Sequence, residues 1–163
     1  MYIAAGIVID VTIKNIEKVK DAIINTISKI ETHSFADNLF YIYNPYLTVI
    51  PKSRGQQIAS IFYHEANPKI DPEIALKQTT YVIGYEDPSL RKYIILITDK
   101  YKKELKIRYE KAIKINKKEN FNSKFIFIGL DNQEFDDLDV KIESIEIENL
   151  EKVLLENINE TFE

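Results

Sequence analysis

The sequence predicts an α/β domain with a doubly wound, mostly parallel sheet, helices on both faces and one antiparallel edge strand. Short, almost wholly apolar runs recur along the chain, each as long as a strand buried on both faces. Segments with apolar residues at spacings of three and four, typical of amphipathic helices, alternate with these runs. Because no repeat, linker or low-complexity tract interrupts this alternation, we expect a single domain over residues 1–163.

The first strand and helix are predicted at the start of the chain. Residues 2–9 form a nearly continuous apolar run and predict a buried strand. Residues 15–31 predict a helix, because their apolar residues fall on one stripe with Lys and Glu opposite. The stripe consists of Ile16, Val19, Ile23, Ile27 and Ile30.

The next segments predict a hairpin followed by two helices. Residues 39–43 and 46–50 are rich in aromatic and β-branched residues and surround an Asn-Pro turn, so they predict two short strands at a sheet edge. Residues 55–66 and 72–86 predict helices. Asp71 is a suitable N-cap for the second of these, and a proline follows it at the first helical position.

The second half of the chain continues the alternation. Residues 92–98 and 124–130 predict buried strands, and residues 140–147 predict a last strand with alternating apolar positions. A lysine-rich helix is expected over 100–118 and a terminal amphipathic helix over 149–162. The inner face of the lysine-rich helix is expected to hold Leu105, Tyr109, Ala112 and Ile113.

Composition limits the classes of function. The chain has 163 residues, no cysteine and a formal net charge of -4. The absence of cysteine and of a positively flanked apolar leader predicts a cytoplasmic protein. No apolar run approaches the ~20 residues of a membrane span, so no membrane association is expected. Nucleic acid is an unlikely partner at this net charge, and no glycine-rich phosphate loop occurs among the four glycines.

Two carboxylates follow buried strands and are expected at one edge of the sheet. Asp10 comes directly after the first apolar run, and Asp99 directly after residues 92–98. Ligands of such sheets bind beyond the carboxyl ends of the strands. Two neighbouring carboxylates repel each other unless a cation lies between them, so the pair suggests a site. The simpler alternative is that each aspartate caps the start of a helix.

At these residues the sequence resembles the von Willebrand factor type A (VWA) domain. The resemblance consists of a first strand ending at Asp10 and followed by Thr12, an amphipathic helix, a hairpin, and the later run YIILITD ending at Asp99. The final strand, loop, strand and helix are similar too, so the resemblance covers essentially the whole chain. It implies a Rossmann-like doubly wound sheet with a metal-ion-dependent adhesion site. In that family, hydroxyl groups of the site coordinate a divalent cation, and this arrangement of oxygen ligands suits Mg²⁺. The resemblance implies that the site binds a partner and does not catalyse a reaction.

The match to the adhesion motif is partial. Asp10, Thr12 and Asp99 keep their places, but Lys14 stands where the second hydroxyl is expected. The later loop threonine has no counterpart, since residues 67–72 occupy its approximate place. An ammonium about 4 Å from a carboxylate gains roughly 4 kcal/mol of attraction at a dielectric constant of 20, before desolvation. We therefore expect that Lys14 pairs with Asp10, Asp99 or both in place of a metal, or else points into solvent above an abandoned site.

The resemblance implies a non-enzymatic intracellular protein-interaction module, an adaptor or accessory subunit, with no cofactor and Mg²⁺ only as a lesser possibility. Its partner-binding residues, in a degenerate adhesion site, are Asp10, Thr12, Lys14 and Asp99. An alternative is a metal-dependent nuclease or phosphoryl-transfer enzyme, in which further carboxylates such as Glu31, Glu65 and Asp131 join the two aspartates. A second alternative is a nucleic-acid-binding protein with a basic surface.

Charge is unevenly distributed along the second half of the chain. Residues 100–124 hold ten Lys or Arg against three Glu, whereas residues 131–163 hold twelve acidic residues against two Lys. Two solvated helix faces explain this pattern most simply. The more specific interpretation is that the basic helix 100–118 of one molecule meets the acidic C-terminal region of another, so that the chain self-associates.

Overall fold

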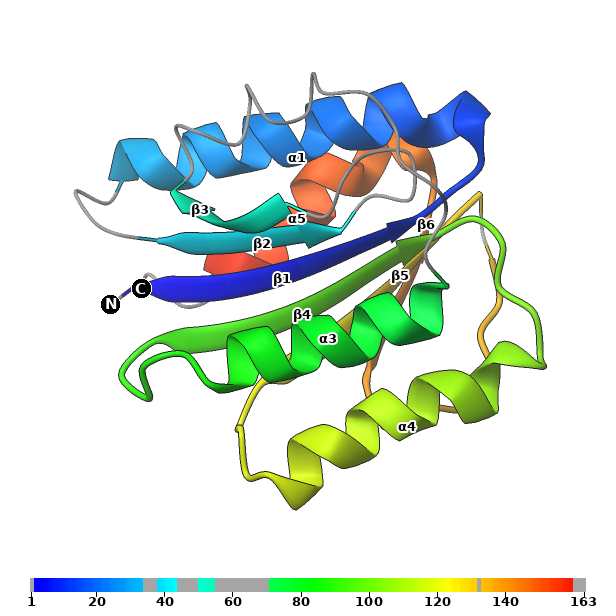
Figure 1. Ribbon diagram of the computed structural model, residues 1–163. Helices are drawn as coiled ribbons and strands as arrows, with labels where there is room; N and C mark the ends of the chain where they lie inside the picture. The colour runs from blue at the N-terminus through cyan, green and yellow to red at the C-terminus, as the bar shows by residue number, and fades with distance from the viewer. Residues whose placement is uncertain (1, 34–37, 44–49, 55–70, 132, 160–163) are drawn as a thin grey trace.

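The computed structural model describes residues 2–33, 38–43, 50–54, 71–131 and 133–159 (Figure 1). Strands and helices alternate along the described chain. In order they are β1 (Ile3–Asp10), α1 (Ile13–His33), β2 (Leu39–Tyr43), β3 (Ile50–Arg54), α3 (Pro72–Gly84), β4 (Arg91–Thr98), α4 (Leu105–Lys118), β5 (Lys124–Leu130), β6 (Lys141–Ile145), the 3₁₀ turn η1 (Ile147–Asn149) and α5 (Leu150–Asn159).

The strands form one sheet in the order β3-β2-β1-β4-β5-β6. From β2 to β6 each neighbouring pair is parallel. The short strand β3 pairs with β2 in the antiparallel direction, with Leu39 opposite Arg54. The central strands β1 and β4 are aligned over their whole length, from Ile3 opposite Arg91 to Asp10 opposite Thr98. Their carboxyl ends therefore lie side by side.

Helices cover both faces of this sheet (Figure 1). On one face α1 and α5 pack together, and their apolar residues join alternate strand residues such as Ile7 and Ile95 in one buried cluster. On the other face α3 and α4 enclose a second cluster with the intervening strand residues, including Val8 and Leu96. The predicted class, an α/β domain with a parallel sheet between two helical layers, is confirmed.

Most of the predicted elements recur with shifted ends. The stripe of the first helix is confirmed, since Val19, Ile23, Ile27 and Ile30 are buried. The lysine-rich helix begins at residue 105 instead of 100. Residues 101–104 precede the helix, and there the hydroxyl of Tyr101 donates to the carboxylate of Asp136 at 3.0 Å.

The predicted hairpin is also displaced. Its second strand was expected over residues 46–50, but the strand that pairs with β2 is Ile50–Arg54. The helix expected over 55–66 lies outside the described residues, as do residues 46–49 of the predicted strand. Among the described helices, none combines the length and the apolar character needed to cross a bilayer.

Helix α3 lies unusually close to β1 at Gly6. A Cβ atom placed on Gly6 would come within 2.2 Å of Cγ2 of Thr79 and 2.9 Å of Cγ1 of Ile83. Both neighbours are fully buried. Glycine is thus required here by the close approach of the helix to the strand, since only a residue without a side chain leaves room for it.

Candidate functional site at the strand ends

Charged and polar side chains meet where β1, β4 and β5 end. The register of β1 and β4 places Asp10 beside Thr98, which brings the next residue, Asp99, to the start of α1. The residues after β5 reach the same edge, because β5 is parallel to β4. We call this group the strand-end cluster, and it consists of Asp10, Thr12, Lys14, Asn15, Asp99, Lys100 and Asp131.

Asp99 is held by donors from the start of α1. The backbone N–H of Thr12 lies 2.9 Å and 3.0 Å from its two carboxylate oxygens, and the hydroxyl of Thr12 donates to Oδ2 at 2.6 Å. The amide of Asn15 donates to the same oxygen at 2.6 Å. A carboxylate in this position also interacts favourably with the positive end of the helix dipole. Asp99 therefore anchors the start of α1 to the residue that follows β4.

Asn15 and Lys14 connect this group to Asp131. The amide of Asn15 lies 3.2 Å from Oδ2 of Asp131, so one buried side chain bridges two carboxylates. The ammonium of Lys14 lies 3.8 Å from the same oxygen, and both charged side chains are largely open to water. Asp131 has a φ angle of 55°, a left-handed conformation that aspartate tolerates better than most residues. An exposed ion pair of this kind contributes at most about 1 kcal/mol.

Asp10 is paired with Lys100. The ammonium of Lys100 lies 3.3 Å from Oδ1 of Asp10, and the Asp10 side chain is 8% exposed. Burial raises the pKa of Asp10 above its usual value; Lys100 opposes this shift, and the negative charges of Asp99 and Asp71 add to it. The ionised form of Asp10 is thus less favourable in the folded protein than in the unfolded chain.

Replacing Asp10 with asparagine is expected to raise the free energy of unfolding at pH 7. The reason is that the pKa of Asp10 is higher in the folded protein than in the unfolded chain, so as the pH falls the folded protein binds the proton before the unfolded chain does. The ionised carboxylate therefore destabilises the folded protein at neutral pH, and this effect fades as the pH falls through the raised pKa. The advantage of the variant over the natural protein should therefore shrink between pH 7 and pH 4, as measured by urea denaturation at each pH. A variant less stable than the natural protein at pH 7 would mean that the pair with Lys100 outweighs burial.

One of the two expectations for Lys14 is wrong. Lys14 does not pair with Asp10 or Asp99, because its partner is Asp131 and Lys100 pairs with Asp10. The Lys14 side chain is 71% exposed, which agrees with the alternative that it points into solvent. Lys14 lies in the first turn of α1, and its ammonium is directed away from Asp10 and Asp99 and toward Asp131. Lys100 follows β4 directly and reaches the buried carboxylate.

The donor set of the cluster does not suit a divalent cation. The oxygens of Asp99 already accept from Thr12 and Asn15, and Asp10 faces an ammonium. Mg²⁺ needs oxygen ligands in octahedral geometry, and a neighbouring lysine charge opposes it. Within the described ranges, no group of three or more His, Cys, Asp or Glu side chains is placed to hold a metal ion.

Three members of the strand-end cluster were predicted from the sequence to lie together, and they do. Two other members were not predicted as part of any site. Asp10, Thr12 and Asp99 lie together, as expected for residues at adjacent parallel strand ends. Asn15 and Lys100 were not singled out. The signal for Lys100 was its position directly after a strand-end aspartate, but no pattern in the sequence distinguishes its ammonium from that of Lys14.

Comparison with known proteins gives structural neighbours only. No family model matches the chain, and no curated protein matches it. A crystal structure of the pilus adhesin SpaC from Lactobacillus rhamnosus GG, in an open conformation, has a TM-score of 0.70 and 11% sequence identity, and the alignment covers 98% of this chain and 30% of the adhesin. A variant of the PilB minor pilin from Streptococcus sanguinis has a TM-score of 0.64 and 12% identity, covering 99% of this chain and 61% of the pilin.

These findings correct three expectations drawn from the sequence. The chain matches no VWA family model, and the solved structures compared above are described as a pilus adhesin and a minor pilin. The assignment to the VWA family with a degenerate adhesion site is therefore wrong. The same neighbours contradict the intracellular adaptor role and the cytoplasmic location. At 11–12% identity, and over less than two thirds of each neighbour's length, the likeness establishes the fold of this chain.

Proposed function

We propose that this chain is a non-enzymatic binding domain of a pilus-associated protein exposed at the cell surface. The observation that carries the proposal is the fold, which is shared over nearly all of this chain with a pilus adhesin and a minor pilin. In both neighbours the matching region is only part of a longer chain. A domain of this kind would therefore act as one module of a larger surface protein.

The chemistry of the strand-end cluster supports a binding role over a catalytic one. A general acid or base needs a carboxyl group that reaches a substrate, and a metal-dependent nuclease needs carboxylates free to ligate metal. The carboxylate oxygens of Asp99 already accept hydrogen bonds from Thr12, and Asp10 is buried beside Lys100. The cluster thus fixes the ends of β1, β4 and α1 relative to one another. Its exposed members, Lys14 and Asp131, present a polar edge to a partner protein.

The experiment that tests the proposal is surface accessibility in the native cell. Intact cells are treated with a protease, and the fragment containing residues 1–163 is followed with an antibody, beside a cytosolic marker. Loss of the fragment with the marker intact supports the proposal; retention until the cells are lysed overturns it. Mg²⁺- or Mn²⁺-dependent cleavage of DNA, RNA or a phosphate ester, abolished by Asp10→Asn, would instead favour the enzyme.

Self-association is the second part of the proposal. Basic α4 lies on one face of the sheet, and α5, the last helix of the acidic C-terminal region, lies on the other (Figure 1). A contact between α4 and the acidic residues of α5 would therefore join different surfaces of two copies. Such head-to-tail contacts extend into rows instead of closing into dimers.

We expect sedimentation velocity at about 0.02 M salt to show species larger than a dimer, which dissociate at about 0.5 M salt. Charge reversal at the exposed residues Lys103 and Lys114, which have no ion pair among the described residues, should abolish these species. A monomer at both salt concentrations would contradict the contact.

A further inference from the structure

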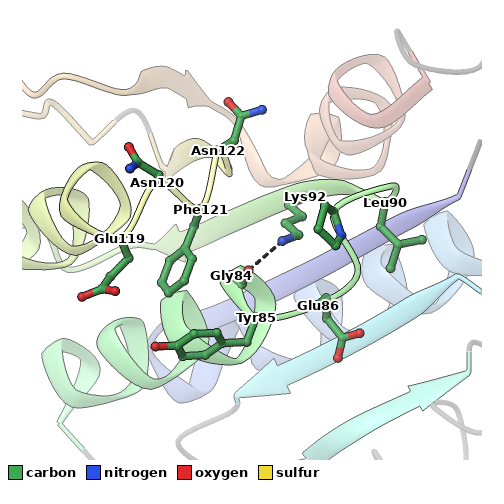
Figure 2. A pocket seen from close by; sticks show the side chains of 10 residues that line it. Gly84, Tyr85, Glu86, Leu90, Lys92, Glu119, Asn120, Phe121 and Asn122 are labelled. Atoms are coloured by element: carbon green, nitrogen blue, oxygen red, sulfur yellow. Dashed lines mark hydrogen bonds between the residues drawn. The ribbon is translucent and has the colours of Figure 1, made fainter.

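A pocket of about 410 Å³ opens at the sheet edge opposite the strand-end cluster. It lies between the end of α3 and the start of β4 on one side, and between the end of α4 and the start of β5 on the other (Figure 2). The residues that matter for its chemistry are Gly84, Tyr85, Glu86, Lys92, Glu119 and Phe121. None of them takes part in the strand-end cluster, so the pocket is a separate site.

One wall of the pocket is aromatic and rigid. Phe121 is buried and packs so closely on Gly84 that a Cβ atom there would lie 2.3 Å from the ring. Tyr85 meets the edge of this ring at a centroid distance of 4.9 Å and an interplanar angle of 72°, and Tyr81 stacks beside Tyr85 at 6.2 Å. Tyr85 is nevertheless 72% exposed, which is unusual for a large ring so well supported. An exposed ring whose rotation is limited by aromatic neighbours offers contact area to a ligand without a large entropic cost.

The floor of the pocket carries a hydrogen-bond donor. Lys92 is only 9% exposed, and its ammonium donates to the carbonyl oxygen of Gly84 at 2.6 Å (Figure 2). An ammonium has three N–H groups. This is the one hydrogen bond found for it among the residues that the structure describes, so two N–H groups remain for water or for the oxygens of a ligand.

The rim carries acceptors. Glu86 and Glu119 line the pocket, and in Figure 2 their carboxyl groups are turned away from the ammonium of Lys92. The pocket also lies at the C-terminal ends of α3 and α4, where the helix dipoles disfavour anions. The carboxylates and the helix dipoles would repel an anionic ligand, and the ammonium of Lys92 would repel a cationic one. Donors and acceptors beside an aromatic face suit a neutral ligand with hydroxyl groups, because each hydroxyl both donates and accepts.

We propose that this pocket binds a neutral saccharide through one pyranose ring. The C–H groups on one face of the ring pack against Tyr85, because the face of an aromatic ring carries partial negative charge. One sugar oxygen accepts from Lys92, and hydroxyls at the opposite side donate to Glu86 and Glu119. The proposal does not depend on the pilus-associated role, since it rests on the pocket alone.

The test is a titration of the ¹⁵N-labelled chain followed by NMR. The probes are glucose, galactose, mannose and N-acetylglucosamine, with sorbitol as the open-chain polyol and cyclohexanol as the ring with a single hydroxyl. We expect at least one sugar to shift the amide signals of residues 84–92 and 119–122 with a roughly millimolar dissociation constant, typical of a ligand this small. Sorbitol and cyclohexanol should shift these signals at least tenfold less at equal concentration.

Two variants make the test specific. Tyr85→Ala removes an exposed ring, so the fold is retained, and binding is expected to weaken at least tenfold. Ile107→Ala, an equally exposed position on the first turns of α4, serves as the matched control and should bind as the natural chain does. Lys92→Arg should retain more binding than Lys92→Met. The proposal is overturned if none of the four sugars produces a shift at 100 mM, if sorbitol or cyclohexanol acts equally, or if Tyr85→Ala leaves binding unchanged.

Discussion

Replacing Asp99 with alanine is expected to lower the free energy of unfolding by about 3 kcal/mol. Three donors lose a charged acceptor whose hydrogen bonds are worth roughly 1.5–3 kcal/mol each, and at this partly exposed site water replaces part of what is lost. The donors that lose their acceptor are the N–H and hydroxyl groups of Thr12 and the side-chain amide of Asn15. For a chain of this size the melting temperature should fall by about 6–12 °C. Urea denaturation followed by circular dichroism measures the effect.

The control for this result is Asp21→Ala, which removes an exposed aspartate from the helix whose start Asp99 anchors. It should change stability by less than about 0.5 kcal/mol. Thr12→Val tests the mechanism, because its cost should be clear in the natural protein and much smaller when Asp99 is already alanine. Additive effects of the two changes would show that Thr12 and Asp99 stabilise the protein independently, contrary to the role given to their hydrogen bonds.

The second large effect is expected from Gly6→Ala, at the closest approach of α3 to β1. The new methyl group would lie 2.2 Å from Cγ2 of Thr79, and the helix cannot yield without disturbing the central strand. Overpacking of this kind costs about 2–3 kcal/mol. Gly129→Ala is the matched comparison. Its nearest neighbour, at 2.8 Å, is Cε2 at the far end of the Phe135 ring, so it should cost less.

A second substitution should rescue Gly6→Ala. Thr79→Ala removes the Cγ2 atom that clashes, and it also removes a buried hydroxyl that has no hydrogen-bond partner among the described residues. The double variant is therefore expected to regain more than half of the lost stability, as measured by thermal denaturation. If Thr79→Ala instead adds its own cost to that of Gly6→Ala, the clash is relieved in another way and the explanation from close packing fails.

The sequence predicted the layers of the fold because its apolar pattern is regular. Parallel strands buried on both faces need continuous apolar runs, and β1, β4 and β5 match the predicted strands within one residue. The predicted start of α4 was wrong: residues 101–104 lie before the helix, where Tyr101 bonds to Asp136, 35 positions away, in a contact that no local pattern reveals. Local periodicity thus fixes which residues are buried and leaves the ends of elements to distant contacts.

The candidate site was predictable to the same extent. Adjacent parallel strands bring their ends together, so the meeting of Asp10 and Asp99 followed from the order of elements. The choice between Lys14 and Lys100 as the partner of Asp10 depends on the path of the chain after β4, which the sequence does not encode in any short motif. The family resemblance covered the order of elements along the whole chain, but its specific part was the same few strand-end residues. A short motif at the end of an apolar strand was therefore too little to establish membership.

The hydrogen bonds between Thr12 and Asp99 also have a consequence for synthesis on the ribosome. They join residues 87 positions apart, and β1 pairs on one side with β4. At about 5–20 residues per second, the first strand and helix wait on the order of ten seconds for these partners to be translated. During that interval one edge of β1, wholly apolar from Ile3 to Ile9, has no strand beside it. Chaperone binding to the nascent chain should therefore be strongest before Asp99 leaves the exit tunnel.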